Sequence, residues 1–278
     1  MEQDRTNSND YVLGHTQQEL DRLISQGRFI GDLTEHMLRL AGINSGMRVL
    51  DIGCGAGDVS FLVRSLVGTD GTVIGVDRAS EAIAIAQQRA QKADLSNVQF
   101  IATDLDKLIL DKPVDALIGR LVLMYFPKPA VVLRHLLSFV KPGGIVAFQE
   151  LDMESVVAQP MCDEFWIAGQ RLNQTFSRAG IDIRTGLKLP FIFQDAGLPA
   201  PQMLQLARVE YGPDSQAYAW IEQLTRTLLP LMQQTGVATA DEVGLDNLAA
   251  RMRDEAVAKK AVLVLPPFIG AWAHKFVA

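Results

Sequence analysis

Short apolar runs alternate with amphipathic stretches between residues 45 and 152. The runs are MRVLDI, TVIGVD, VQFIAT, VDALIG and GIVAFQEL, and the stretches between them include SFLVRSLV, EAIAIAQQRAQKA and AVVLRHLLSFV. Runs of this length, rich in β-branched residues, predict buried strands, whereas the amphipathic stretches have the periodicity of helices. Strand and helix in alternation predict an α/β fold with a mostly parallel sheet covered on both faces.

The chain on either side of this region has a helical pattern. Apolar residues near period 3.6 predict two helices or one bent helix within the first forty or so residues. After residue 152, helices are predicted for MCDEFWIAGQRLNQTFSRAG, for DSQAYAWIEQLTRTLLPLMQQ with a bend at Pro230, and for residues 241–258.

Two more strands are predicted in QMLQLARVEY and in part of VLVLPPFIGAWAHKFVA. Pro266 and Pro267 indicate an edge or a bulge in the second of these, because proline cannot donate to a sheet ladder. The helical segment between the two strands would form either a cap over a cleft or ordinary cover for the sheet. The pattern leaves both interpretations open.

Composition narrows the classes of protein and of partner. A chain of 278 residues with 48% hydrophobic content can build one sizeable core. Its net charge of −6 argues against nucleic acid as the main partner. Two distant cysteines, Cys54 and Cys162, indicate neither a disulfide framework nor a zinc site and fit the reducing cytoplasm. We therefore expect a cytoplasmic protein without a signal peptide, membrane insertion or bound metal.

The stretch VLDIGCGAGD places Gly53, Gly55 and Gly57 directly after a predicted strand and before a predicted helix. Open α/β sheets bind ligands at this position, although a tight turn without a ligand would have the same pattern. A dinucleotide fingerprint, G-x-G-x-x-G, is the other alternative, but here the third glycine comes one position early. Asp51 and Asp58 add negative charge that opposes a phosphate. The loop therefore favours a ligand that is not a phosphate ester and that carries positive charge.

Two more carboxylates end the next two predicted strands. Asp77 could accept hydrogen bonds from both hydroxyls of a ribose, or it could cap the following helix, a role for which Ser80 competes. Asp104 could accept a hydrogen bond from an adenine amine, or it could be a solvated turn residue. Together with Asp51, these acids at successive strand ends predict a ligand that contains a nucleoside.

These motifs resemble those of the class I S-adenosylmethionine-dependent methyltransferases. VLDIGCGAGD is similar to the glycine-rich first motif of that family, VIGVDRA to its ribose-binding acid and FIATDLDKL to its adenine-side acid, while VKPGGIVAFQELD resembles the segment that leads into its fifth strand. The resemblance implies a Rossmann-like, seven-stranded sheet whose last strand is antiparallel. It also implies three parts: a helical lid (1–44), the cofactor-binding core (45–152), and substrate-side helices with the last two strands (153–278).

The resemblance also implies roles for individual residues toward S-adenosylmethionine, whose product form is S-adenosylhomocysteine. Arg120 would meet the carboxylate of its methionine part, although a surface salt bridge would explain this arginine equally well. Tyr11, in the amino-terminal lead, is a further contact candidate. The other implied cofactor contacts are Gly53, Gly55 and Gly57 at the amino-acid part, Asp51 at the ammonium, Asp77 at the ribose, and Arg78, Asp104 and Leu105 at the adenine.

The activity implied is in-line displacement of the methyl group onto a small-molecule oxygen, nitrogen or carbon nucleophile, in secondary metabolism. A general base is needed only for a weakly acidic acceptor, and the candidates near the reaction are His15, Tyr125 and Asp152. Met124, Glu150, Trp166, Arg171 and Asn173 are further candidates for substrate contact, whereas His36 and His135 fit structural or surface positions. The resemblance leaves room for a homodimer.

Alternative functions stay open at this point, among them a non-enzymatic binding module and a protein or nucleic-acid methyltransferase. The fold could catalyse a reaction other than methyl transfer, such as decarboxylation or cyclisation, or the chain could be a nicotinamide-dependent oxidoreductase. The glycine spacing disfavours the oxidoreductase.

Overall fold

The computed structural model describes the backbone of residues 17–277 and the side chains of residues 29–277. Its main sheet has the strand order β3-β2-β1-β4-β5-β10-β7. Neighbouring strands from β3 to β5 are parallel, and β10 is antiparallel to both of its neighbours. This confirms the predicted Rossmann-like fold. The strands are β1 (Arg48–Ile52), β2 (Thr72–Asp77), β3 (Val98–Ala102), β4 (Val114–Arg120), β5 (Val140–Leu151), β7 (Gln202–Leu206) and β10 (Phe268–His274).

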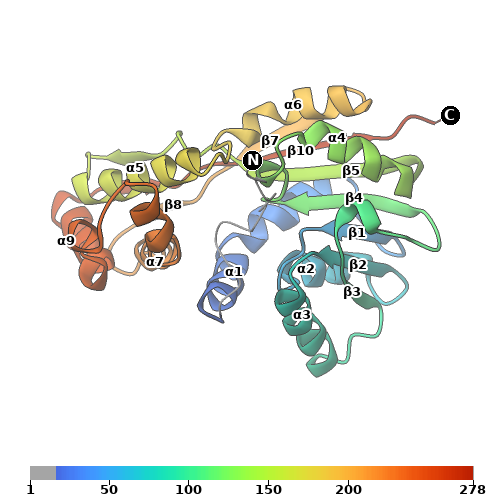
Figure 1. The fold of residues 1–278 in the computed structure, drawn as a ribbon, viewed down its shortest axis with the longest axis horizontal. Coiled ribbons are helices and arrows are strands. Elements are labelled where there is room, and N and C mark those ends of the chain that lie inside the picture. The colour runs from blue at the N-terminus through green and yellow to red at the C-terminus, as the bar shows by residue number, and fades with distance from the viewer. Residues whose placement is uncertain (1–16, 278) are drawn as a thin grey trace, which may run out of the picture.

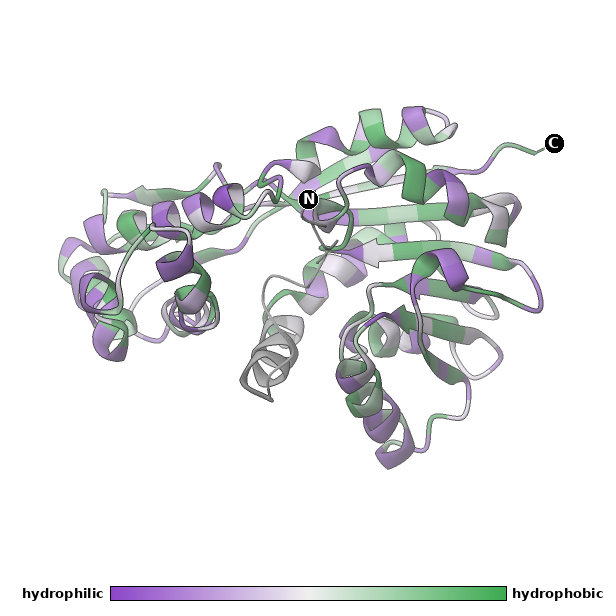
Figure 2. Ribbon diagram, viewed as in Figure 1, coloured by the Kyte–Doolittle hydropathy of each residue, from purple (hydrophilic) through white to green (hydrophobic). Residues whose placement is uncertain are grey.

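Helices cover both faces of this sheet (Figure 1). Alternate residues of a strand point to opposite faces: Val49 belongs to the buried cluster under α1, α2 and α3, and Leu50 to the cluster under α4 and α6. Figure 2 shows the resulting concentration of hydrophobic positions on the strands. The five helices are α1 (Gln17–Leu40), α2 (Asp58–Val67), α3 (Ser80–Lys92), α4 (Pro129–Leu136) and α6 (Thr185–Ala196).

The remaining elements form a separate cap beyond the end of the main sheet (Figure 1). Its helices share their own buried cluster, in which Phe165, Trp220 and Leu228 take part. The helical segment between the last two strands of the main sheet is therefore a cap and not ordinary sheet cover. The cap consists of α5 (Asp163–Arg178), α7 (Ala217–Gln234), α8 (Ala240–Val243) and α9 (Leu248–Lys259), with a small antiparallel sheet of β6 (Val157–Gln159), β9 (Val262–Val264) and β8 (Val209–Tyr211).

Two strand predictions near the cap were wrong. QMLQLARVEY is not one strand, because it divides into β7 of the main sheet and β8 of the small sheet. Arg208, at the division, donates two hydrogen bonds to the carbonyl of Phe29 on α1. The expected edge or bulge at Pro266 and Pro267 is also wrong: both prolines lie between β9 and β10, and β10 is inside the main sheet.

The helix predictions need smaller corrections. The amino-terminal pattern forms one helix, α1, over the described residues. The single helix expected over residues 241–258 is interrupted after Val243, where Gly244 has a φ of 56°. Neither α6 nor the small sheet was predicted from the sequence pattern. Within the described part of the chain, no helix combines the length and hydropathy needed to cross a bilayer.

Candidate functional site

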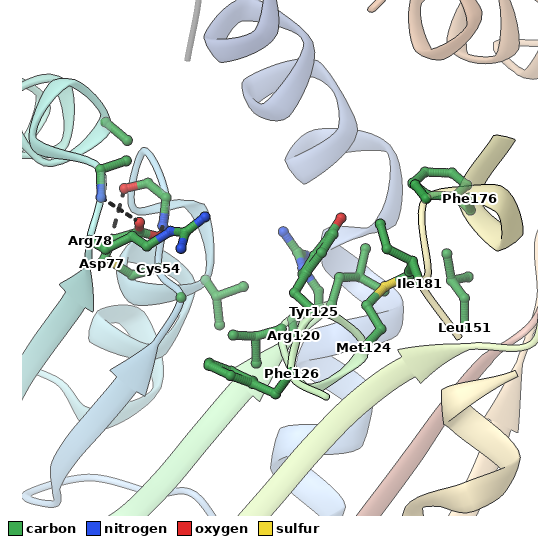
Figure 3. Close-up of a pocket in the computed structure, with 18 of the residues that line it drawn as sticks. Cys54, Asp77, Arg78, Arg120, Met124, Tyr125, Phe126, Leu151, Phe176 and Ile181 are labelled. Carbon is green, nitrogen blue, oxygen red and sulfur yellow. Dashed lines mark hydrogen bonds between the residues drawn. The ribbon is translucent and has the colours of Figure 1, made fainter. Parts of the chain in front are cut away.

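A cavity of about 1420 Å³ lies at the carboxyl ends of the central strands and extends under the cap. Figure 3 shows Cys54, Asp77 and Arg78 at one end and Leu151, Phe176 and Ile181 at the other. Arg120, Met124, Tyr125 and Phe126 lie between the two ends (Figure 3). The cavity therefore has a core end, built on the main sheet, and a cap end.

The glycine turn forms one wall of the core end, and its geometry requires glycine at two positions. Gly53 has a φ of 64°, and a Cβ there would lie 2.4 Å from Cγ2 of Val122. Gly57 has a φ of 90° and directly precedes α2. Such backbone conformations are costly for residues with a side chain. Because the turn brings bare backbone to the cavity wall, a ligand can approach it closely.

The carboxylate of Asp77 holds the glycine turn against the end of β2. One oxygen accepts a hydrogen bond from the backbone N–H of Gly55 at 2.9 Å, and the other accepts from Ala79 at 2.9 Å. The second bond comes just before α3, whose N-cap residue is Ala79, without a side-chain cap, so the cap role considered for Asp77 and Ser80 is not found. Asp77 also lines the cavity. Each carboxylate oxygen has further acceptor capacity for a ligand hydroxyl.

Asp51 is a buried carboxylate that lines the same end of the cavity. It accepts a hydrogen bond from Oγ of Ser60 at 2.6 Å. Burial raises the pKa of Asp51 to about 7, although the Ser60 hydrogen bond and the positive charge of Arg120 both lower it. A bound cation beside Asp51 would stabilise its ionised form.

The negative charge of Asp58 is balanced by a residue that the sequence analysis missed. Arg89 on α3 forms an ion pair with Asp58 at 2.8 Å and donates a hydrogen bond to the carbonyl of Ala56. Its guanidinium also lies 4.8 Å from the ring centroid of Phe61. Asp58 therefore contributes less free negative charge to the cavity than the sequence pattern indicated.

The predicted adenine side of the cavity is assembled from the two segments that follow β2 and β3. Arg78, Asp104 and Leu105 all line it. Asp104 is half exposed and pairs with Lys107 at 2.9 Å, and the hydrogen bond from Lys107 lowers the pKa of Asp104. The interpretation of Asp104 as a solvated turn residue thus fits the structure as well as a ligand contact does. His135, expected at a structural or surface position, is exposed and also lines the cavity.

Arg120 connects the cavity to α1. Its Nη1 donates a hydrogen bond to Oγ1 of Thr34 at 3.1 Å, and Thr34 donates to Oε1 of Gln149 at 2.7 Å. Burial lowers the pKa of Arg120, while Asp58 and Asp51 oppose that shift. These contacts are those of a residue at the cavity wall, not those of a surface salt bridge.

Replacing Thr34 with valine should lower the free energy of unfolding by about 1 kcal/mol, since two polar side chains lose a buried partner. Urea denaturation followed by circular dichroism measures this change. Thr34→Ser is the control because it keeps the hydroxyl. A serine variant as unstable as the valine variant would contradict the importance of the hydroxyl network.

The predicted catalytic residues are not all brought together. Tyr125 lines the cavity between its two ends. Asp152 is buried, but it pairs with Arg184 at 3.2 Å and accepts a hydrogen bond from Ser155, and it is not among the lining residues. Its catalytic role stays a prediction that this geometry does not favour. His15 and Tyr11 lie outside the described residues.

The buried carboxylate of Glu150 binds the backbone of a loop that lines the cavity. One oxygen of its carboxylate accepts hydrogen bonds from the backbone N–H groups of Val122 and Leu123, at 2.9 and 2.7 Å. Leu121, just before them, has a φ of 53°. Burial raises the pKa of Glu150 to about 7 against the lowering effect of these bonds. Glu150 thus fixes the loop that carries Met124 and Tyr125, in place of the substrate contact expected for it.

The sequence analysis missed most of the cap end. Of the candidates named on α5, Asn173 lines the cavity, whereas Trp166 and Arg171 do not. Figure 3 shows Phe176 and Ile181 beside Leu151 at this end. The remaining wall comes largely from apolar side chains of α5 and α7, among them Phe165, Leu172, Trp220, Ile221 and Leu224.

Comparison with known proteins gives consistent matches over the core. Residues 43–196 match a family described as "Methyltransferase domain". A ubiquinone biosynthesis O-methyltransferase of Albidiferax ferrireducens is 36% identical over 122 residues, which cover 41% of this chain and 47% of the relative. An arsenite methyltransferase of Halobacterium salinarum is 36% identical over 112 residues, 40% of this chain and 29% of the relative. The chain thus spans about half or less of the length of these two relatives.

A solved structure extends the likeness in fold beyond the core. It is that of a putative methyltransferase from Bacillus halodurans, with a TM-score of 0.56, 14% identity, and coverage of 87% of this chain and 97% of the other. At this identity the likeness concerns the fold alone.

Proposed function

Because this chain belongs to the class I S-adenosylmethionine-dependent methyltransferases, we propose that it transfers a methyl group from S-adenosylmethionine to a small molecule. The observation that carries the proposal is the core end of the cavity. There Asp77 binds the glycine turn through Gly55, and the buried carboxylate of Asp51 lies in the same wall. The relatives named above fit a small-molecule acceptor, and one of them is named for a biosynthetic pathway.

The residues of the core end fit the cofactor part by part. Asp77 has acceptor capacity for ribose hydroxyls, and Arg78, Asp104 and Leu105 surround the space for the adenine. Asp51 would hold the ammonium, and Arg120 would meet the carboxylate through a charge-assisted hydrogen bond. The bare backbone at Gly53 and Gly55, which line the cavity, leaves room for the methionine chain between these two charges, whereas Gly57 does not line it.

The protein's task in this reaction is mainly positioning. S-adenosylmethionine supplies a methyl group that the adjacent sulfonium activates for displacement, and the sulfur keeps the electron pair of the bond that breaks. The chain holds the acceptor in line with that bond, at about 3 to 3.5 Å from the methyl carbon. Arg120, Met124 and Tyr125 lie at the junction of the two ends, where the reacting atoms would meet. An acceptor that carries a proton releases it to water at this junction.

Binding of the purified protein to candidate cofactors tests the proposal directly. We expect S-adenosylhomocysteine, at a concentration about 100 times its Kd, to stabilise the fold by about 2.7 kcal/mol and so to raise the melting temperature. NADH at the same concentration should leave it unchanged. A shift with NADH alone would favour the oxidoreductase alternative. Failure of a radiolabelled methyl group to reach any acceptor, despite tight cofactor binding, would favour a non-methylating reaction.

Three further parts of the proposal, namely the metabolic role, the location and the assembly, come from the sequence alone. We propose a role in secondary metabolism, a cytoplasmic location and assembly as a homodimer. Activity assays with defined metabolites, cell fractionation and light scattering would test these features in turn.

A further inference from the structure

The cap end of the cavity is large enough for a second molecule beside the cofactor. Typical pockets for one small ligand have volumes of about 300 to 1,000 Å³, whereas this cavity measures about 1420 Å³. The wall of the cap end is formed by side chains such as Leu151, Phe165, Phe176, Ile221 and Leu224. Aliphatic and aromatic groups therefore surround the space that the acceptor would fill.

The two ends of the cavity differ in charge. Among the described lining residues, every charged side chain belongs to residues 51–135. These side chains are the aspartates, Lys107, Arg78, Arg120 and His135. Lining residues beyond position 150 carry no ionisable side chain. A charged group placed at the cap end would lose its hydration without gaining a partner, which costs far more than burying apolar surface returns. The cap end thus selects against phosphates, carboxylates and ammonium groups.

Two polar side chains interrupt the apolar wall. Asn173 donates a hydrogen bond from Nδ2 to the carbonyl of Met153 at 3.0 Å, so this side chain is already anchored to the protein. Trp220 is 92% buried, and its Nε1–H has no hydrogen-bond partner among the described residues. Its ring packs against Phe29 on α1, with the centroids 5.9 Å apart. Nε1 itself has less than 1 Å² of accessible surface, so Trp220 presents ring carbons and not its N–H to the cavity.

From these observations we propose that the methyl acceptor is a neutral, largely apolar molecule. Its apolar body fills the cap end and packs against the ring of Trp220. The nucleophilic atom lies at the other end of the molecule, at the junction beside Arg120 and Tyr125. This inference rests on the proposed function and adds the chemical class of the acceptor to it.

Three matched probes test the proposal on the protein saturated with S-adenosylhomocysteine. α-Tetralone is a neutral aromatic ketone, tetralin has the same ring system without oxygen, and α-naphthyl phosphate carries charge on a similar body. In calorimetric titrations, we expect both neutral compounds to bind and the phosphate to give no measurable binding. Equal or tighter binding of the phosphate, or no binding of the neutral compounds, would overturn the proposal.

A variant of Trp220 tests the apolar contact. Trp220→Phe removes part of the ring surface, so it should weaken the binding of both neutral probes about two- to tenfold and change cofactor binding less than about twofold. Trp166→Phe is the matched control, because Trp166 is exposed on α5 and does not line this cavity. Unchanged binding of both neutral probes in Trp220→Phe would contradict the contact with the ring.

These experiments distinguish a failure of the proposed acceptor class from a failure of the proposed methyl transfer. If the probes behave as expected but no methyl group moves from labelled S-adenosylmethionine, the apolar site stands and methyl transfer fails. If instead the protein methylates glycine or another charged acceptor and binds no neutral probe, methyl transfer stands and the proposed acceptor class fails.

Discussion

Replacing Asp77 with alanine should weaken the binding of S-adenosylhomocysteine by about 1.5 to 3 kcal/mol, or roughly 10- to 150-fold. The carboxylate would lose its hydrogen bonds with the ribose hydroxyls, which are bonds to a charged group. It would also release the N–H of Gly55, so the glycine turn would no longer be fixed against β2. Calorimetric titration measures the affinity, and circular dichroism shows that the variant remains folded.

Two further variants sharpen this test. Asp77→Asn keeps the size of the side chain and one acceptor oxygen, so its loss of affinity should be intermediate. Asp70→Ala removes the same charge from an exposed position that does not line the cavity, and its affinity should match that of the unchanged protein. Affinity for Asp77→Ala within about twofold of the unchanged protein would contradict the ribose assignment.

The parts of the fold that could be predicted are those that local chemistry determines. The strands β1, β2 and β4 and the second half of β5 are buried on both faces and therefore appear as continuous apolar runs. Asp51 and Asp77 are on or at the ends of such strands, and the glycine turn follows one of them, so strand boundaries alone place these residues at one edge of the sheet. The cofactor end of the cavity followed from this arrangement.

The residues that were missed act through contacts between distant parts of the chain. Arg89 neutralises Asp58 from 31 positions away, and no pattern within α3 distinguishes it from a solvated arginine. Glu150 ends a strand as Asp77 does, yet its carboxylate turns to the backbone of the neighbouring loop. Which partner such a side chain binds depends on the spacing of neighbouring elements, which cannot be deduced from the sequence pattern.

The cap end was missed for a different reason. An apolar face on α5 or α7 has the same helical spacing whether its side chains fill a core or surround a cavity. Phe165 and Leu172 do both, since they belong to the buried cluster of the cap and line the cavity. Only the packing of the two helices against β5 and α1 separates these possibilities.

The affinity for S-adenosylhomocysteine should increase as the pH rises through about 7, because the ligand ammonium pairs with the ionised form of Asp51. Burial raises the pKa of this carboxyl to about 7 in the protein without ligand. A positive ligand group lowers that pKa, so binding releases a proton and is opposed by acid. Below pH 7 the apparent affinity falls with the fraction of ionised Asp51, which gives roughly a tenfold loss between about pH 7.5 and about pH 6. The ligand's own α-amino group lies beside its free carboxylate, as in a free amino acid, and stays protonated throughout this range.

Asp51→Asn distinguishes this carboxylate from other groups that titrate near neutrality. The pKa of Glu150 is also raised to about 7, but its carboxylate faces the backbone of Val122 and Leu123 and does not line the cavity. The asparagine variant should bind more weakly by about 1.5 to 3 kcal/mol at pH 7.5, and its affinity should be nearly constant down to pH 6. Calorimetry in buffers of different ionisation enthalpy counts the proton released by the unchanged protein, and none should be released by the variant. A pH dependence that persists in Asp51→Asn would assign the titration to another group and leave the ammonium without its proposed partner.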